Sequence, residues 1–173
     1  MEKDIKLTKR DIKDKGGSNS SIIITPPLGL SGIERFKCYG EDIQPEAFAP
    51  DVRRVMRRIK KRLKKENIPS YLVTHKEIID KNNTYVSESH IAFQIALGDL
   101  GLKKFNEEKI YSATYKISLV NTLTGTISYS KVITGTHSAK KKDNATKGFY
   151  GSLDNALDQF VSGPEFKQGL SID

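Results

Sequence analysis

The residues with the clearest chemical character form a basic run in the first half of the sequence. Nine arginine and lysine residues fall within thirteen consecutive positions, and no acidic residue interrupts them. They are Arg53, Arg54, Arg57, Arg58, Lys60, Lys61, Arg62, Lys64 and Lys65. Helical surfaces usually mix the two signs of charge, because like charges four residues apart destabilise a helix by about 0.2–0.5 kcal/mol per pair. The run therefore indicates a positive surface that contacts an anionic partner.

A shorter basic segment, Lys140, Lys141 and Lys142, lies in a polar stretch further along the chain. The sequence carries 29 Lys and Arg against 21 Asp and Glu, a formal net charge of +8. This excess favours nucleic acid, an anionic membrane surface or an acidic protein face as the partner. Nucleic acid is the weaker alternative, because no stacking aromatics interleave the basic run and no nucleic-acid-binding motif accompanies it. A solvated surface without any partner is the remaining alternative.

No motif for catalysis or metal binding accompanies the basic residues. His75, His90 and His137 each lie outside any nucleophile or metal-ligand pattern, and the lone Cys38 has no histidine close to it in the sequence. One cysteine and three dispersed histidines do not supply the clustered ligands of structural zinc. We therefore expect no catalytic residue, no metal, no cofactor and no small-molecule substrate. An enzyme whose site assembles residues far apart in the sequence is the least favoured class.

The basic run belongs to the most regular helical pattern in the sequence, predicted over residues 50–66. The apolar residues share one stripe at helical spacing: Val52, Val55, Met56, Ile59 and Leu63. Asp51 begins the helix and Pro69 lies beyond its end. Short apolar strands predicted over residues 22–25 and 71–74 flank the helix, an order that is typical of an α/β fold.

The second half of the sequence predicts a β-hairpin followed by a closing helix. Residues 110–120 alternate between apolar and polar side chains, with one face formed by Tyr111, Ala113, Tyr115, Ile117 and Leu119. A turn at 121–125 leads to a partner strand over residues 126–136. Asn144 is suited to cap a last helix over residues 144–162, where the apolar residues again form a stripe.

Three further assignments complete the expected fold. Residues 87–97 are predicted as a helix, and residues 28–49 as a loop punctuated by glycine and proline. Residues 1–21 are charged and end in a Gly/Ser segment, so we expect a flexible tail or tether before a single domain at 22–173. We therefore predict an α/β domain in which about three helices cover a mixed, largely antiparallel sheet of three to five strands.

Residues 115–130, with the sequence YKISLVNTLTGTISYS, resemble a group of bacterial envelope lipoprotein domains. The group includes the curli-secretion lipoprotein, the lipoprotein activators of penicillin-binding proteins and the amino-terminal domain of TolB. These domains carry a strand, an Asp/Asn-Thr-x-Thr-Gly turn and a second strand, followed by a glycine-containing strand end, a polar loop and an Ala-rich helix. In this sequence the glycine-containing strand end corresponds to Gly135, the polar loop to residues 140–143 and the Ala-rich helix to residues 145–161. A strand that the group places before the hairpin is missing or very short around residues 101–106.

The resemblance implies a non-enzymatic accessory protein of the periplasm that docks on another envelope protein. The segment before Ser21 would be its tether. A lipid anchor in the outer membrane is implied only where a native signal precedes the sequence, because there is no lipobox and Cys38 lies too far inside the chain. Without such a signal we expect a cytoplasmic protein, for which nucleic-acid binding through the basic helix is the alternative function.

Overall fold

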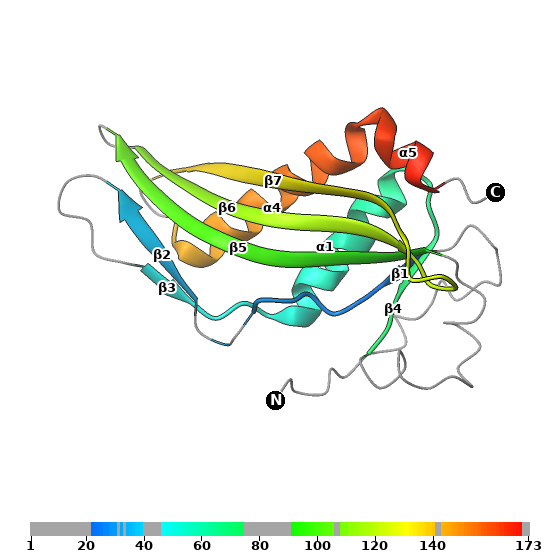
Figure 1. Cartoon of the computed structure of the whole chain (residues 1–173). Helices are drawn as coiled ribbons and strands as arrows, with labels where there is room; N and C mark the ends of the chain where they lie inside the picture. The colour runs from blue at the N-terminus through cyan, green and yellow to red at the C-terminus, as the bar shows by residue number, and fades with distance from the viewer. Residues whose placement is uncertain are drawn as a thin grey trace.

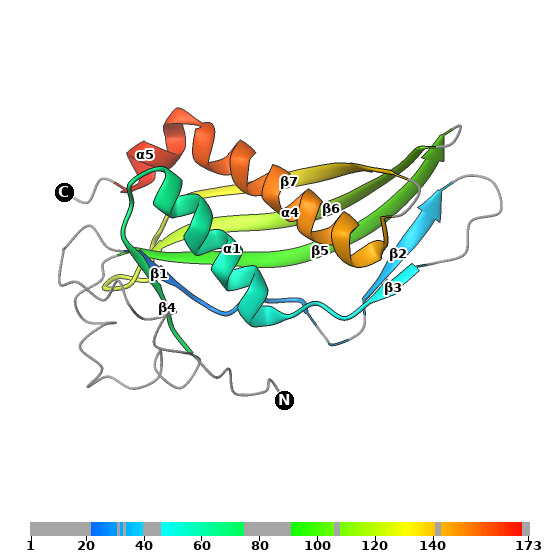
Figure 2. The same ribbon diagram turned by 180° about the vertical axis from the view of Figure 1, so that it is seen from behind.

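The structure is a computed structural model that describes residues 22–30, 32, 34–39, 46–74, 91–105, 108–140 and 143–170. Its elements, in chain order, are β1 (Ile22–Ile24), β2 (Glu34–Tyr39), β3 (Glu46–Phe48), α1 (Val52–Lys65), β4 (Ser70–Leu72), β5 (Ile91–Phe105), β6 (Glu108–Asn121), β7 (Ile127–Ala139), α4 (Ala145–Ser162) and α5 (Pro164–Leu170). The strands form one seven-stranded sheet. Figures 1 and 2 show that α1 and α4 lie side by side across one face of this sheet. The expected tail at 1–21, together with His75, His90, Lys141 and Lys142, lies outside the described residues.

The sheet is organised around β5. One edge of β5 pairs with β6 in antiparallel register along most of its length, and β6 pairs in turn with β7. The other edge of β5 pairs in parallel with β1 near Ile91 and with β2 near Gly101. Beyond these, β4 pairs with β1 in parallel and β3 pairs with β2 in antiparallel register. The predicted mixed and largely antiparallel sheet is confirmed, but it has seven strands rather than three to five.

The predicted helix at 50–66 is confirmed as α1, which spans Val52–Lys65 and buries four of the five residues of the predicted stripe. The side chain of Asp51 accepts a hydrogen bond from the backbone N–H of Arg54 at 3.2 Å, which satisfies a donor that the first turn leaves unpaired. Val55, Met56, Ile59 and Leu63 are buried. Burial of these four side chains contributes about 6–12 kcal/mol, at about 1.5–3 kcal/mol each. This gain fixes the helix on the sheet and directs its basic residues away from the core.

The predicted hairpin is confirmed as β6 and β7. All five residues of the predicted apolar face of β6 are buried: Tyr111, Ala113, Tyr115, Ile117 and Leu119. Asn121 shapes the turn, because its side-chain oxygen accepts hydrogen bonds from the backbone N–H groups of Leu123 and Thr124 at 2.9 and 3.2 Å. Gly125 closes the turn at a φ of 73°, in the left-handed region that glycine adopts without steric cost.

Helix α4 packs on β7 and also covers the backbone of this edge strand. Asn144 caps α4 as predicted, since its side chain accepts a hydrogen bond from the N–H of Lys147 at 3.0 Å. Near the middle of the helix, Asn155 accepts a hydrogen bond from the N–H of Thr136 at 3.0 Å, and one turn later Gln159 donates one to the carbonyl of Thr134 at 3.2 Å. These hydrogen bonds satisfy part of the backbone at the open edge of the sheet. They thereby lower the tendency of β7 to pair with strands of other molecules.

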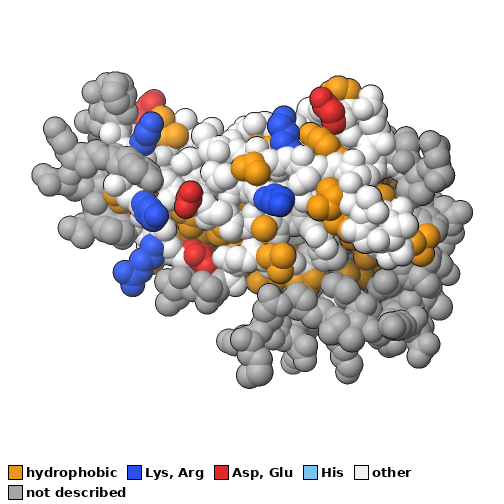
Figure 3. All heavy atoms as spheres, in the orientation of Figure 1, with side chains coloured by type: hydrophobic (Ala, Val, Ile, Leu, Met, Phe, Trp, Pro, Cys, Tyr) orange, Lys and Arg blue, Asp and Glu red, His pale blue; other side chains and the backbone are white. Residues whose placement is uncertain are grey.

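The opposite face of the β5–β6–β7 region carries mainly hydroxyl side chains. Figure 3 shows this face, with scattered hydrophobic side chains and few charged ones. Hydroxyl pairs link neighbouring strands, with Thr114 and Thr134 at 3.0 Å and Ser118 and Ser130 at 2.8 Å. Val132 is a large apolar side chain that stays 65% exposed here. This face thus follows the polar half of the alternation predicted from the sequence.

Two of the predicted assignments are wrong. Residues 87–97 were expected to form a helix, but Ile91–Phe105 is the long strand β5. Ile91 and Ile95 are four residues apart, a spacing that fits a helix as well as a strand, and Ala92 and Phe93 between them are also buried, so the local pattern does not distinguish the two. β5 also supplies the strand that was considered missing around residues 101–106.

The expected loop at 28–49 contains the strands β2 and β3. Phe36 and Phe48 are buried there and pack against each other with their ring centroids 5.2 Å apart. Both strands are short, and they lack an alternation that a sequence pattern would reveal. The helix α5 was also not predicted, because the last expected helix ends at residue 162 and the Gly163–Pro164 pair after it is typical of a helix end. Pro164 is instead the first residue of α5, a position where its missing N–H has no cost.

Candidate functional site

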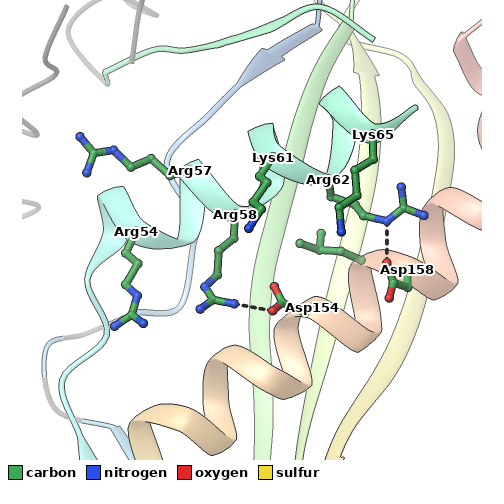
Figure 4. A pocket seen from close by; sticks show the side chains of 9 residues that line it. Arg54, Arg57, Arg58, Lys61, Arg62, Lys65, Asp154 and Asp158 are labelled. Atoms are coloured by element: carbon green, nitrogen blue, oxygen red, sulfur yellow. Dashed lines mark hydrogen bonds and ion pairs between the residues drawn. The ribbon is translucent and has the colours of Figure 1, made fainter. Parts of the chain in front are cut away.

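The main basic surface of the structure borders a groove between α1 and α4. The groove has a volume of about 290 Å³ and is shown from close by in Figure 4. Its lining residues are Arg54, Arg57, Arg58, Lys61, Arg62, Lys65, Asp154, Leu157 and Asp158. Six of the nine residues in the predicted basic run therefore meet at this groove, whereas Arg53, Lys60 and Lys64 do not line it.

Two arginines of α1 are held by acidic residues of α4. Arg58 forms an ion pair with Asp154, and the Nε of Arg62 lies 2.5 Å from a carboxylate oxygen of Asp158. Arg62 also pairs with Glu66 at 2.9 Å. Burial alone would lower the pKa of Arg62, but the hydrogen bonds to Glu66 and Asp158 outweigh it and raise that pKa. Positive charge on α1 is thus partly compensated by a helix 96 residues later in the chain, which the sequence pattern did not show.

The aromatic ring of Tyr150 contacts two arginines in the first half of α1. The guanidinium carbons of Arg54 and Arg58 lie 4.0 and 4.8 Å from the ring centroid of Tyr150. The hydroxyl of Tyr150 accepts a hydrogen bond from the backbone N–H of Asp51 at 3.1 Å, and burial raises the pKa of Tyr150. Cation–π contacts of this kind contribute about 0.5–1 kcal/mol at exposed sites. Tyr150 therefore joins α4 to the start of α1 and orients two guanidinium groups.

Lys61 and Lys65 complete the lining of the groove. Figure 4 shows both side chains extending from α1 between the two ion pairs, while Arg57 points away from α4. Lys61, Lys65 and Arg54 are exposed. Six cations and two carboxylates line the groove, so its formal charge is 6 − 2 = +4. The arrangement concentrates positive charge at a concave surface and is suited to bind an anionic group.

Sequence reasoning missed the partners of the basic run on α4. Asp154 and Asp158 are four residues apart on the predicted helix and outside its apolar stripe, a pattern that places two carboxylates on one helical face. That signal was available, but nothing in the sequence indicated which surface this face would meet. Lys140, from the second basic segment, is exposed and does not line the groove.

His137 and Cys38, the two candidate catalytic residues that the structure describes, lie apart from this groove. The Nε2 of His137 lies 3.5 Å from the carboxylate of Asp143 and has no hydrogen-bond partner among the described residues. Cys38 is half-buried, and burial raises the pKa of its thiol, which lowers the fraction of reactive thiolate at neutral pH. Near it, Glu46 accepts hydrogen bonds from Lys109 at 2.8 Å and from the hydroxyl of Tyr111 at 2.6 Å.

Asp143 predicts a pH dependence of stability. The backbone N–H of Lys140, then His137 and Lys147, hold the pKa of Asp143 below its usual range. A lowered carboxylate pKa stabilises the fold at pH values above the unfolded pKa of about 3.9, and this contribution is lost as the pH falls through the folded pKa. We expect Asp143→Asn to lower the melting temperature at pH 6 and to make little difference at pH 2. Thermal melts of both proteins at pH 6, 4, 3 and 2 measure this, and an equal gap at every pH would contradict it.

Solved structures that share this fold include two bacterial proteins. Protein XCC0632 from Xanthomonas campestris, of the family DUF330, aligns with a TM-score of 0.52 and 8% identity over 87% of this chain and 83% of that one. The PelC dodecamer from Paraburkholderia phytofirmans aligns with a TM-score of 0.50 and 13% identity over 90% of this chain and 89% of the PelC chain. Lipoprotein GNA1162 from Neisseria meningitidis aligns less closely, with a TM-score of 0.43 and 13% identity over 83% and 98% of the two chains.

No protein-family model and no curated protein matches the sequence. The structural similarity therefore concerns the fold, which this chain has in common with XCC0632 and PelC. The resemblance to the three named groups of lipoprotein domains remains a prediction from the sequence. Among the described residues, no helix is both long and apolar enough to cross a membrane.

Proposed function

We propose that the protein is a non-catalytic interaction domain of a bacterial cell-envelope assembly, and that the basic surface of α1 binds another protein of that assembly. One observation carries the proposal. The apolar stripe of α1 is buried against the core, while nine cations remain on the rest of a helix of 14 residues. Such a surface attracts an acidic partner and speeds its association, because complementary potentials steer the encounter.

The shared fold and the sequence resemblance support the envelope part of the proposal. PelC, which has this fold, forms a dodecamer, so the fold is compatible with a multi-subunit assembly. The hairpin segment at 115–130 resembles envelope lipoprotein domains, and it forms the β6–β7 turn as that resemblance implies. A location in the periplasm follows from the same proposal. Nucleic-acid binding in the cytoplasm is the alternative that the experiment tests.

The experiment uses the native gene with a tag, expressed in its host. Four exchanges on α1, Lys60→Glu, Lys61→Glu, Lys64→Glu and Lys65→Glu, nearly neutralise the basic run and leave the ion-paired Arg58 and Arg62 in place. A matched control reverses four exposed lysines of the sheet: Lys103, Lys104, Lys116 and Lys131. Cells are fractionated, and proteins in contact are crosslinked before purification.

We expect the protein in the envelope fraction, with one crosslinked partner protein that is lost in the α1 variant and retained in the control. A steep fall in partner capture with added salt should accompany it. Fractionation with the cytoplasm or crosslinking to nucleic acid would contradict the proposal. Equal capture of the partner by the unchanged protein, the α1 variant and the control would contradict it as well.

A further inference from the structure

We propose that the groove between α1 and α4 is a binding site for a phosphoryl group. This inference goes beyond the proposed function, because it assigns a ligand chemistry to one concave part of the basic surface. It also holds for the purified protein without any partner. The groove volume of about 290 Å³ lies at the lower end of the range for small-molecule sites, which suits a compact anionic head group.

Two of the four guanidinium groups that line the groove are oriented before any ligand arrives. Arg58 is held by Asp154 and by the ring of Tyr150, and Arg62 by Asp158 and Glu66. A guanidinium carries five N–H donors in a fixed plane, and these contacts occupy only some of them. A ligand therefore meets donors whose side-chain freedom has already been lost, which lowers the entropic cost of binding.

Lys61 and Lys65 supply the adaptable charges of the same site. They are four residues apart on α1, which separates them by about 6 Å along the helix axis. Each ammonium offers three donors on a flexible stem. Because both side chains extend between the two ion pairs, they can close around an anion that the guanidinium groups position (Figure 4).

The chemistry of the lining favours phosphate over a carboxylate. A phosphomonoester carries a charge of about −1.5 to −2 and three acceptor oxygens, whereas a carboxylate carries one charge and two oxygens. The formal charge of +4 at the groove matches the more highly charged group, and the negative charges of Asp154 and Asp158 are offset by their arginines. Leu157, buried at the groove, excludes water on one side and so strengthens these contacts.

Two sources could present this group: a soluble phosphate or the head group of a phospholipid. Binding is measured on the full chain by titration calorimetry with inorganic phosphate, pyrophosphate and acetate at constant ionic strength. Co-sedimentation with vesicles of phosphatidylcholine containing phosphatidic acid tests the lipid source, with pure phosphatidylcholine as the blank. Tighter binding to the vesicles than to pyrophosphate assigns the head group, and the reverse order assigns a soluble ligand.

Two variants of equal charge decide whether the groove is responsible. Lys61→Ala with Lys65→Ala removes two lining residues, while Lys60→Ala with Lys64→Ala removes two charges at the same spacing from the same helix outside the lining. Alanine is a strong helix former, so both variants should keep α1. Circular dichroism and the melting temperature check that each variant is folded.

We expect the groove variant to bind the phosphoryl probe at least about tenfold more weakly, because each charge-assisted hydrogen bond is worth at least about one factor of ten. The control variant should change affinity less than about threefold, because Lys60 and Lys64 do not line the groove and charges near the surface contribute little at a distance. Equal losses in the two variants, equal affinity for acetate and phosphate, or no binding of any phosphoryl probe would overturn the assignment. None of these results depends on the envelope partner, so the proposed function stands or fails separately.

Discussion

Replacing Gly135 with alanine is expected to destabilise the protein by about 3 kcal/mol or more, at the upper end of the effect of overpacking. Gly135 lies in β7 under α4, and a Cβ atom there would stand 1.9 Å from the carbonyl oxygen of Ser152 and 2.9 Å from the backbone nitrogen of Ala156. Both neighbours are backbone atoms of α4, so no side-chain rotation relieves the clash. The helix has to move away from the sheet. Urea denaturation followed by circular dichroism measures the loss.

Gly98→Ala is the matched control, because it places the same methyl group on another strand of the sheet. Its Cβ would lie 3.2 Å from the carbonyl oxygen of Thr114, a contact that a small shift relieves. We expect it to cost less than about 1 kcal/mol, as most mild substitutions do. If Gly135→Ala were as stable as this control, α4 would have to lie further from β7 than the structure shows.

Replacing Phe160 with alanine is expected to cost about 3–5 kcal/mol, the usual effect of removing a buried phenylalanine side chain. Phe160 is fully buried, and its ring lies 5.0 Å from that of Tyr129 and 5.5 Å from those of Phe93 and Phe166. These rings come from β7, β5 and α5. The cavity that the alanine variant leaves would therefore weaken the packing of α4 against three elements. Urea denaturation measures the loss.

Phe160→Leu separates the loss of volume from the loss of the aromatic contacts. It keeps most of the apolar area and should retain at least half of the stability that the alanine variant loses. Equal stability of the unchanged protein, Phe160→Ala and Phe160→Leu would contradict this packing of α4. The result also bears on the groove, because Asp154 and Asp158 lie on the same helix and keep their places only while α4 stays docked.

The longer elements that sequence alone predicted correctly are those with a strong local period. The stripe of α1 recurs at helical spacing over three turns, and the alternation of β6 extends over five buried residues. The caps at Asp51 and Asn144 and the turn at Asn121 depend on hydrogen bonds within three residues of each other. Such features are set by neighbours in the chain, so the sequence carries them directly.

The misassigned segments lacked such a local signal. β5 is buried partly on both faces, and its buried residues Ile91, Ala92, Phe93 and Ile95 fit a helix and a strand about equally well. β2 and β3 are short, and their pairing with β5 and with each other is non-local. Only the assembled sheet, in which backbone groups of distant segments must pair, decides that these residues are strands.

The sequence by itself determined that α1 is a basic amphipathic helix, because the order of its residues separates the apolar stripe from the charged remainder. The tertiary structure alone decided which cations share a concave site and which acids hold them. Arg58 and Arg62 meet Asp154 and Asp158 because α1 and α4 pack side by side on one sheet face, which brings residues 96 positions apart into ion pairs. Electrostatic contacts depend on distance in space, and that distance is set by the packing of both helices on the core.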